Sequence, residues 1–220
     1  MIEHVYRRAR LAQSVERVIV ATDDERIRSV IEPLGEVVMT AREHESGTDR
    51  IGEVAESIDC EIVVNVQGDL PLLDPAMVDA LVKVLRAQPE VGMATVAVRI
   101  RNSDELDDPS VVKVVRNLRG HALYFSRACI PHDRERPGEL TGALHHVGLY
   151  AYRRETLLEL ANLDPTPLER TEKLEQLRAL ENGIGIAVVV CDGAPPIAVD
   201  TQSDVVAARQ ALARERDANR

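Results

Sequence analysis

The chain has 220 residues, of which 45% are apolar and 29% are charged, an ordinary balance for one sizeable globular domain. Its formal net charge of -10 argues against a nucleic-acid binder that relies on a basic surface. Cys60, Cys129 and Cys191 are widely spaced, which indicates reduced thiols rather than a disulfide or metal framework. The sequence shows no signal-peptide pattern and no apolar run that could span a membrane, so we expect a cytoplasmic protein.

Helices and strands alternate from the amino terminus to about residue 99. Apolar runs predict strands at 18–21, 37–39, 61–66 and 92–98, and the segments around them predict helices at 2–13, 25–32, 49–57 and 76–86. The run at 62–66 is almost continuously apolar, which is typical of a strand covered on both faces. This alternation predicts an α/β fold with a mainly parallel, right-handed βαβ sheet.

Residues 111–153 depart from this pattern. Apolar runs at 111–115 and 122–125 flank a turn-like Asn-Leu-Arg-Gly segment, and a further strand is predicted at 146–152. We interpret 111–153 as an antiparallel extension, or flap, packed on the parallel sheet. Because no linker separates it from the rest, we expect residues 1–220 to form a single domain.

The last third of the chain returns to helices and a strand. Thr166, Pro167 and Glu169 provide an N-cap, a proline at the first helical position and a capping-box acid. A helix is predicted at 172–181, a strand at 186–191, and a final helix after residue 201.

Two aspartates follow apolar runs. Asp69 comes just after the strand predicted at 61–66, and Asp200 comes just after residues 196–199. Open α/β sheets bind their ligands beyond the carboxyl ends of the strands, so the two carboxylates can meet there. Mg2+ is typically held by one or two protein carboxylates together with water and phosphate oxygens. The sequence therefore predicts a magnesium site, with an ordinary turn and helix cap as the simpler alternative.

Two further groups of polar residues are candidates for binding. The small residues at 46–50 precede a helix, where backbone N–H groups can bind a phosphate or base, although Ser46 or Thr48 can equally be a plain helix cap. His146 and Tyr150 are four residues apart on a predicted strand, so both face one side. A pocket wall and a solvent-exposed face both remain open for that side.

Three motifs are specific: Tyr-Phe-Ser-Arg…Ile-Pro at 124–131, His-x-Gly-x-Tyr-x-Tyr-Arg at 146–153 and Leu-Glu-Gln-Leu-Arg at 174–178. With the segments 20–27, 46–50, 64–72, 113–115 and 199–204, they resemble the 3-deoxy-manno-octulosonate cytidylyltransferase (CMP-Kdo synthetase) family, in the family's order and over essentially the whole chain.

The resemblance implies a Rossmann-like sheet of the nucleotide-diphospho-sugar transferase type, a homodimer, and a role in lipopolysaccharide biosynthesis. The implied reaction is CTP + Kdo → CMP-Kdo + pyrophosphate, with Mg2+ as cofactor and no nucleic-acid partner. The residues that match functional positions of the family are Asp69 and Asp200 for Mg2+, Ser46, Arg50 and Gln67 for the nucleotide, and Arg127, His146, Tyr150, Glu175 and Gln176 for Kdo. Arg127 and His146 suit a carboxylate, whereas Glu175 and Gln176 suit sugar hydroxyls.

The sequence departs from the family pattern in two places. The family's first strand and its Pro-Ala-Arg…Arg-Leu-Pro-Gly-Lys loop would precede Met1, and Leu70 stands where the family usually has Glu. Because the other site residues are intact, we expect a start codon assigned too late. A truncated, non-catalytic nucleotide-binding relative and a cytidylyltransferase for another acidic sugar remain as alternatives.

Overall fold

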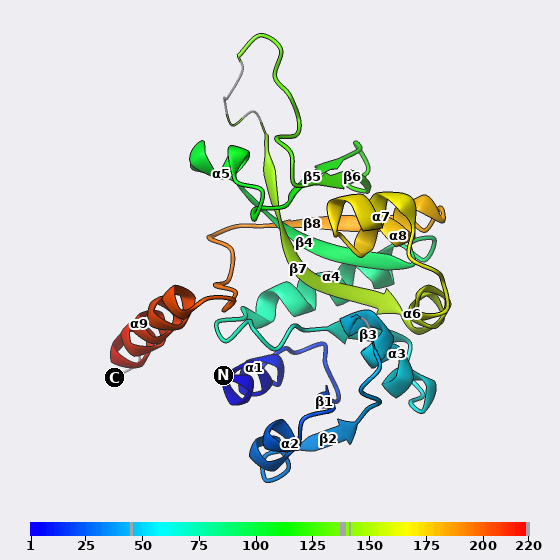
Figure 1. The fold of residues 1–220 in the computed structure, drawn as a ribbon, viewed down its shortest axis with the longest axis vertical. Helices are drawn as coiled ribbons and strands as arrows, with labels where there is room; N and C mark the ends of the chain where they lie inside the picture. Colours follow the sequence, from blue (N-terminus) through cyan, green and yellow to red (C-terminus); the bar gives the residue numbers. More distant parts are fainter. Residues whose placement is uncertain (45, 137–139, 141, 219–220) are drawn as a thin grey trace. The chain divides into compact units, whose positions relative to one another are not determined.

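The computed structural model describes residues 1–44, 46–136, 140 and 142–218 (Figure 1). These residues fall into two compact units. Unit 1 comprises Met1–Ser57, Val66–Asp79 and the described part of Pro196–Arg220, and unit 2 comprises Ile58–Asn65 and Ala80–Pro195. Each unit is described by itself below. The assignment of the whole chain to a single domain stays a prediction.

Unit 1 contains a short parallel sheet and, among its described residues, the helices α1 (Ile2–Ala9), α2 (Glu25–Ile31), α3 (Gly47–Glu56) and α9 (Gln202–Ala218). The strands of the sheet are β1 (Ile19–Thr22) and β2 (Glu36–Met39). The strands β1 and β2 pair in parallel, with Ile19 opposite Glu36, and α2 connects them. The predicted alternation of strand, helix and parallel strand is therefore confirmed in this unit.

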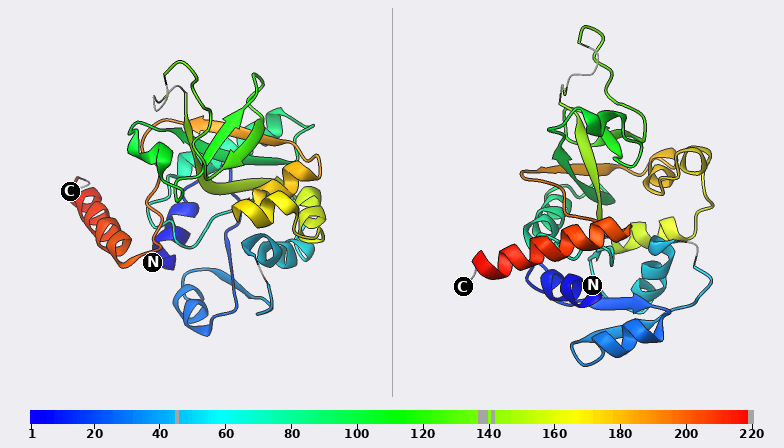
Figure 2. Two further views of the ribbon diagram at one scale, coloured as in Figure 1. Left: turned by 45° about the horizontal axis from the view of Figure 1, so that its top comes forward. Right: turned by 60° about the vertical axis from the view of Figure 1, so that its left-hand side comes forward.

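Helix α1 connects distant parts of unit 1. Val5 and Ala9 bury their side chains on its apolar face, as expected for an amphipathic helix. Arg8 donates a hydrogen bond to the carbonyl oxygen of Leu73 at 3.0 Å and forms an ion pair with Glu215 of α9. The two helices lie next to each other in both views of Figure 2.

Unit 2 is built on a six-stranded sheet with the order β6-β5-β7-β4-β8, and β3 pairs with β7. The strands are β3 (Ile62–Asn65), β4 (Met93–Arg99), β5 (Lys113–Arg116), β6 (Ala122–Ser126), β7 (Leu144–Arg153) and β8 (Ile186–Cys191). Strand β7 is antiparallel to both β3 and β4, whereas β8 is parallel to β4. Consequently β3, β4 and β8 run in one direction, and β7 is the reversed strand between β3 and β4.

We expected the strand at 62–66 to be covered on both faces, but this description fits β4 better than β3. Residues 62–64 of β3 are only partly buried, whereas residues 93–98 of β4 are completely buried. Both segments are continuous apolar runs, and local pattern cannot rank them, because burial depends on which strands pair on either side. The antiparallel pairing predicted within 111–153 is confirmed for β5, β6 and β7, and residues 137–139 and 141 lie outside the described part.

The helices of unit 2 correct one prediction. They are the later part of α4 (Pro75–Ala87), α5 (Asp104–Asp107), α6 (Arg154–Ala161), α7 (Pro167–Glu172) and α8 (Gln176–Glu181). The predicted N-cap Thr166 and first-turn Pro167 are confirmed at α7. A continuous helix over 172–181 is wrong, because Lys173 adopts a left-handed conformation with φ of 55° and separates α7 from α8.

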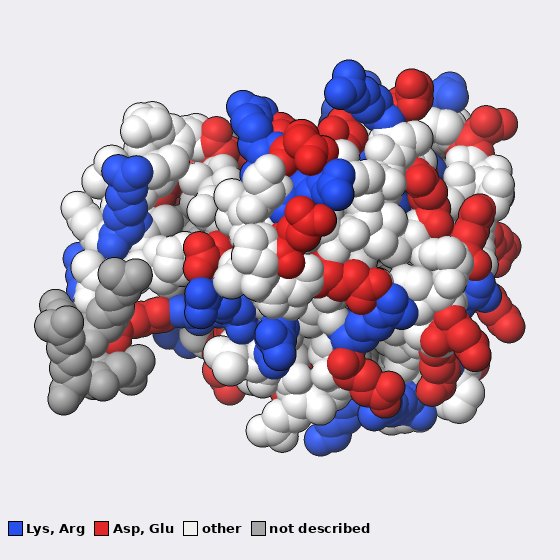
Figure 3. Space-filling model, turned by 90° about the horizontal axis from the view of Figure 1, so that it is seen from below, with Lys and Arg blue, Asp and Glu red and all other residues white. Residues whose placement is uncertain are grey.

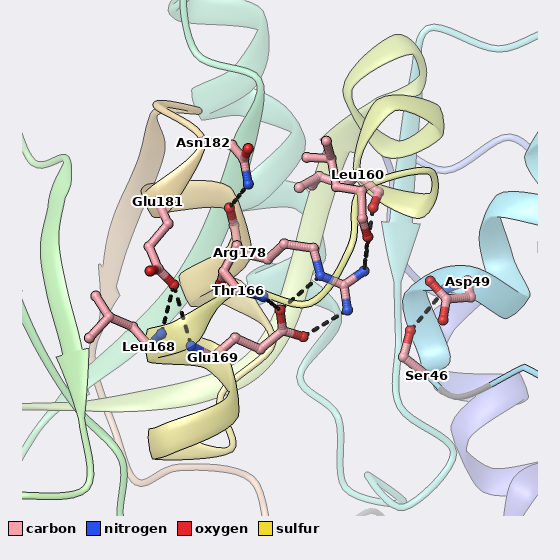
Figure 4. Close-up of polar contacts among 10 residues, drawn as sticks. Ser46, Asp49, Leu160, Thr166, Leu168, Glu169, Arg178, Glu181 and Asn182 are labelled. Carbon is pink, nitrogen blue, oxygen red and sulfur yellow. Dashed lines mark hydrogen bonds and ion pairs between the residues drawn. The ribbon is translucent and has the colours of Figure 1, made fainter.

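A buried ion pair joins α7 to α8 (Figure 4). Arg178 donates two hydrogen bonds to the carboxylate of Glu169, at 3.0 and 2.7 Å, and a further one to the carbonyl oxygen of Leu163 at 3.3 Å. The same carboxylate accepts the backbone N–H of Thr166 at 3.0 Å. Burial alone would raise the pKa of Glu169, but these hydrogen bonds outweigh it and hold that pKa below its ordinary value.

Replacing Arg178 by Met should strongly destabilise the protein. The change leaves the carboxylate of Glu169 buried without its cation, which typically costs about 3–5 kcal/mol of unfolding free energy. Urea unfolding at neutral pH would measure the loss. As the pH falls through the lowered pKa of Glu169, the wild-type advantage should disappear, because the native carboxylate then becomes protonated.

The double variant Glu169→Leu/Arg178→Met provides the matched control. It removes both charges, so we expect it to recover much of the lost stability. A single Arg178→Met variant that unfolds at the wild-type urea concentration would contradict this account of the pair.

Candidate functional site

Asp69 and Asp200 lie side by side in unit 1, although residues 196–199 form no strand. The backbone N–H of Val199 donates to the carbonyl oxygen of Asp69 at 3.0 Å, which brings the segment of Asp200 alongside. Burial, together with the negative charge of Asp200, raises the pKa of Asp69 above its ordinary value. In the described part of the chain, Oδ1 of Asp69 is buried and has no hydrogen-bond partner.

This pair of carboxylates fits a hard divalent cation. A buried carboxylate oxygen without a hydrogen-bond donor is unfavourable unless a cation binds to it. A second carboxylate beside it adds repulsion, which a bound cation would also relieve. No cluster of three or more acidic, histidine or cysteine side chains suited to a metal occurs within the described residues. A site with two protein carboxylates suits Mg2+, which takes its remaining ligands from water and phosphate.

Local contacts fix the chain on either side of Asp69 and Asp200. Leu70 donates its backbone N–H to the carbonyl oxygen of Gln67 at 3.4 Å, and its side chain is buried. Leucine at this position therefore packs in the apolar interior. On the other segment, Oγ1 of Thr201 accepts the N–H of Asp204 at 3.4 Å, and the carboxylate of Asp204 accepts the N–H of Thr201 at 2.8 Å. This reciprocal pair caps α9, so the side chain of Asp200 is not the helix cap.

The predicted nucleotide residues Ser46 and Arg50 are both at the start of α3. Oγ of Ser46 accepts the backbone N–H of Asp49 at 3.1 Å, so Ser46 is the N-cap, as its simpler explanation required (Figure 4). The guanidinium of Arg50 lies 3.3 Å from the carboxylate of Asp23 and donates to the carbonyl oxygen of Ala41 at 3.2 Å. Capping fixes the end of the helix at which backbone N–H groups can face an anion.

In unit 2 the structure brings together His146, Tyr150 and Gln176. The rings of His146 and Tyr150 are 5.4 Å apart, which confirms that they share one side of β7. The hydroxyl of Tyr150 donates to Oε1 of Gln176 at 3.1 Å. His146 and Gln176 are 6% and 5% exposed, so this side of the strand is not a solvent face. Within the described residues, Nε2 of Gln176 is buried without a partner.

The ring of His146 is neutral near pH 7. Burial, followed by the charge of His145, lowers the pKa of His146 to about 3. Its Nε2 lies 2.9 Å from Oγ1 of Thr95, a residue of β4 that is completely buried. A neutral imidazole offers hydrogen bonds but no charge, so Arg127 is the cation in the predicted sugar-binding set.

Arg127 is fixed by surrounding carbonyl groups. Its Nε donates to the carbonyl oxygen of Glu172 at 2.8 Å, Nη1 to that of Pro109 at 2.8 Å, and Nη2 to that of Lys173 at 3.4 Å. The carboxylate of Glu172 also accepts the backbone N–H of Arg127 at 3.0 Å. A guanidinium has more N–H groups than these three carbonyls use, so Arg127 can still donate to a ligand.

Sequence reasoning did not identify Thr95 or Glu172. Thr95 lies within a continuous apolar strand, where a β-branched residue is expected for packing alone. Glu172 was placed on the face of one long helix, but it ends α7 and contacts Arg127. The contact of Thr95 with His146 and that of Glu172 with Arg127 both join residues far apart in the sequence, so neither is visible from local pattern. Glu175, by contrast, was predicted for the sugar set, and it lies directly beside Gln176 where α8 begins.

Comparisons with known proteins identify the family. Residues 1–186 match the family model described as Cytidylyltransferase. A 3-deoxy-manno-octulosonate cytidylyltransferase of Syntrophotalea carbinolica is 50% identical to this chain, covering 94% of the chain and 85% of the relative. A protein with the same description from Geobacter sulfurreducens is 49% identical, covering 93% and 86%. The chain belongs to the 3-deoxy-manno-octulosonate cytidylyltransferase family.

The fold agrees with that family. A solved CMP:2-keto-3-deoxy-manno-octonic acid synthetase complexed with CTP superposes with a TM-score of 0.91 at 40% identity, covering 97% of this chain and 88% of the other. A 4-diphosphocytidyl-2C-methyl-D-erythritol synthase from Anaerococcus prevotii, 13% identical with a TM-score of 0.63, shares the fold alone. The Rossmann-like α/β fold predicted for this cytidylyltransferase is therefore confirmed.

Two further predictions concern the surface and the membrane. On the face drawn in Figure 3, Lys and Arg side chains are interspersed with Asp and Glu rather than gathered in one basic patch. This distribution agrees with the acidic net charge. Among the described helices, none combines the length and apolar character needed to cross a membrane.

Replacing Asp69 by Asn should stabilise the metal-free protein at neutral pH. Because the pKa of Asp69 is raised, ionisation opposes folding at every pH above that pKa, and an uncharged amide removes this penalty. We expect the Tm of the variant in EDTA to be higher than that of the wild type. The same variant should lose the increase in Tm that Mg2+ and CTP together give the wild type.

The exposed residue Asp192 offers a matched control. Asp192→Asn removes an equal charge outside unit 1. Its Tm in EDTA and its Tm with Mg2+ and CTP should therefore both equal those of the wild type. An Asp69→Asn variant that melts earlier than the wild type in EDTA, or that keeps the full Mg2+-dependent shift, would contradict the metal assignment.

Proposed function

We propose that this chain transfers CMP from CTP to Kdo and releases pyrophosphate, which activates the sugar acid for lipopolysaccharide biosynthesis. The observation that carries the proposal is the buried, unpartnered Oδ1 of Asp69 beside Asp200, in a chain about half identical to relatives that bear the name of this activity. The anomeric hydroxyl oxygen of Kdo attacks the α-phosphorus. The bond to the bridging α–β oxygen breaks, pyrophosphate leaves with both electrons, and the hydroxyl proton is lost.

Residues of unit 1 bind the nucleotide and the cation in this proposal. Ser46 holds the N-terminal end of α3 so that backbone N–H groups face the nucleotide, and Arg50 and Gln67 contribute polar side chains to it. Asp69 and Asp200 hold Mg2+. When bound, the ion neutralises charge on the phosphates and stabilises the departing pyrophosphate. The carboxylate of Asp69 must be ionised for this, so cation affinity falls as the pH drops through its raised pKa.

Residues of unit 2 bind the sugar acid. Arg127 pairs with the carboxylate of Kdo through the N–H groups that the surrounding carbonyls leave unused. Tyr150, Glu175 and Gln176 bind hydroxyl groups, and the neutral ring of His146 adds a hydrogen bond without charge. Nε2 of Gln176 is available for such a contact, since it is buried and unpartnered in the described part of the chain.

We extend the proposal to a homodimer that works in the cytoplasm. The support for both statements is the resemblance to the family. Sedimentation of the purified chain would test the dimer directly.

Pyrophosphate release from CTP and Mg2+ tests the proposed reaction. The assay is run with Kdo, with another acidic sugar such as N-acetylneuraminate, and without any acceptor. Release that requires Kdo and forms CMP-Kdo in equal amount supports the proposal. Release with only the other acidic sugar would assign a different acceptor, and CTP binding without any release would indicate a non-catalytic nucleotide-binding protein.

Replacing Arg127 by Met should weaken the binding of Kdo specifically. A charge-assisted hydrogen bond is worth about 1.5–3 kcal/mol, so KM for Kdo should rise roughly 10- to 100-fold while KM for CTP changes little. Arg119→Met is the control, because Arg119 is exposed in the turn between β5 and β6. Equal effects of the two substitutions on KM for Kdo would exclude Arg127 from the sugar site.

A further inference from the structure

A buried hydroxyl lies between the His146 ring and an irregularity in β7. Thr95 on β4 pairs with Tyr150, but its neighbour Val96 pairs with Val147, so β7 carries extra residues at this point. Oγ1 of Thr95 lies 2.9 Å from the carbonyl oxygen of Leu149 and 3.4 Å from that of Val147. It also lies 2.9 Å from Nε2 of His146.

The hydrogen bonds of the Thr95 hydroxyl indicate which nitrogen of the His146 ring carries the proton. A threonine hydroxyl has a single proton to donate, and a carbonyl oxygen can only accept. Oγ1 is 2.9 Å from both the carbonyl oxygen of Leu149 and Nε2 of His146, and donation of its proton to the carbonyl satisfies both contacts if the ring donates in turn. The contact with His146 can then be a hydrogen bond only if Nε2 of His146 carries the proton and donates. The opposite tautomer would leave either this carbonyl or the bare Nε2 without a donor in a completely buried place.

We propose that Thr95 is a positioning residue that holds neutral His146 in the Nε2–H tautomer and so presents Nδ1 as an acceptor for a hydroxyl group of the sugar-acid substrate. The assignment of the tautomer rests on the contacts above. The identity of the ligand rests on the proposed function, in which His146 belongs to the sugar-binding residues.

Aromatic neighbours keep the ring in this orientation. The ring of Phe125 meets it edge to face at 4.9 Å, and the ring of Tyr150 lies 5.4 Å away. These contacts oppose a flip that would exchange the positions of Nδ1 and Nε2. Burial also keeps the ring unprotonated, so Nδ1 retains its lone pair at neutral pH.

The arrangement has a consequence for substrate choice. A bare Nδ1 accepts a proton donor and repels a carbonyl or ether oxygen at the same place. The substrate must therefore present a hydroxyl group to His146, and an analogue that lacks this hydroxyl leaves Nδ1 unpaired in a dry site. The carboxylate of the sugar acid, which has no proton to donate, goes to Arg127 instead.

Nitrogen-15 NMR of the full 220-residue chain tests the tautomer without any substrate. In a neutral imidazole, the protonated nitrogen and the bare nitrogen resonate far apart, and their couplings to the ring protons distinguish Nδ1 from Nε2. His146→Gln identifies the signals of this ring among the six histidines. We expect Nε2–H for the wild type and for Thr95→Ser, which keeps the hydroxyl. A bare Nε2 in the wild type would overturn the proposal.

Thr95→Val removes the hydroxyl at nearly constant volume. We expect its His146 to show a mixture of tautomers, and we expect the dissociation constant for Kdo, measured by calorimetry, to rise about tenfold, the equivalent of one hydrogen bond. Thr95→Ser should restore both readings. A Thr95→Val variant that folds and keeps a pure Nε2–H tautomer would overturn the role of Thr95. If Thr95→Val does not fold, the spectra of the wild type and Thr95→Ser still decide the tautomer.

The NMR tautomer and the dissociation constant for Kdo together distinguish a failure of this proposal from a failure of the proposed function. Nε2–H in the wild type and its loss in Thr95→Val, with no Kdo binding by any variant, would support the tautomer and reject Kdo as the ligand. Kdo binding that is equal in the wild type and in Thr95→Val would keep the proposed function and reject the contribution of Thr95 to it.

Discussion

Three backbone carbonyl groups surround the ammonium group of Lys113, which is completely buried in the sheet of unit 2. Nζ donates to the carbonyl oxygens of Asp108 at 2.9 Å, Val111 at 2.6 Å and Arg127 at 2.7 Å, so every ammonium proton has an acceptor. A buried charge without hydrogen-bond partners would cost several kcal/mol of stability. The fold of unit 2 must therefore supply a partner for each polar group that it buries. Because one of the three acceptors belongs to Arg127, satisfying the lysine also fixes the backbone of the arginine that we assign to the sugar carboxylate.

A few buried side-chain atoms of the described residues have no hydrogen-bond partner, among them Oδ1 of Asp69 and Nε2 of Gln176. Both belong to residues that we assign to ligands. At Arg178 and Glu169, by contrast, the two buried charged groups are paired with each other. An unsatisfied carboxylate or amide lowers stability until a cation or a hydroxyl group completes it, which is the role we assign to the ligands at Asp69 and Gln176.

Local sequence patterns predicted much of this structure, and most of the failures share one cause. The positions of β1, β2, β5 and β6 and the meeting of Asp69 with Asp200 follow from apolar runs and from the rule that ligands bind beyond strand ends. The insertion of β7 between β3 and β4, the hydrogen bonds of Thr95 and the support of Arg127 by Glu172 all depend on partners far along the chain. The break at Lys173 was missed for a different reason, because lysine carries no local signal for a left-handed residue.

The division of the chain has a consequence for the order of events during synthesis. Unit 2 consists largely of the continuous stretch Ala80–Pro195, whereas unit 1 is assembled from segments near the beginning, the middle and the end of the chain. A ribosome therefore releases most of unit 2 before the residues that complete unit 1 exist. Asp200 is synthesised after all of unit 2, so its carboxylate can come to lie beside that of Asp69 only after residue 200 has left the ribosome. Contacts of such high sequence separation form late, which makes unit 1 the part that a co-translational chaperone would protect.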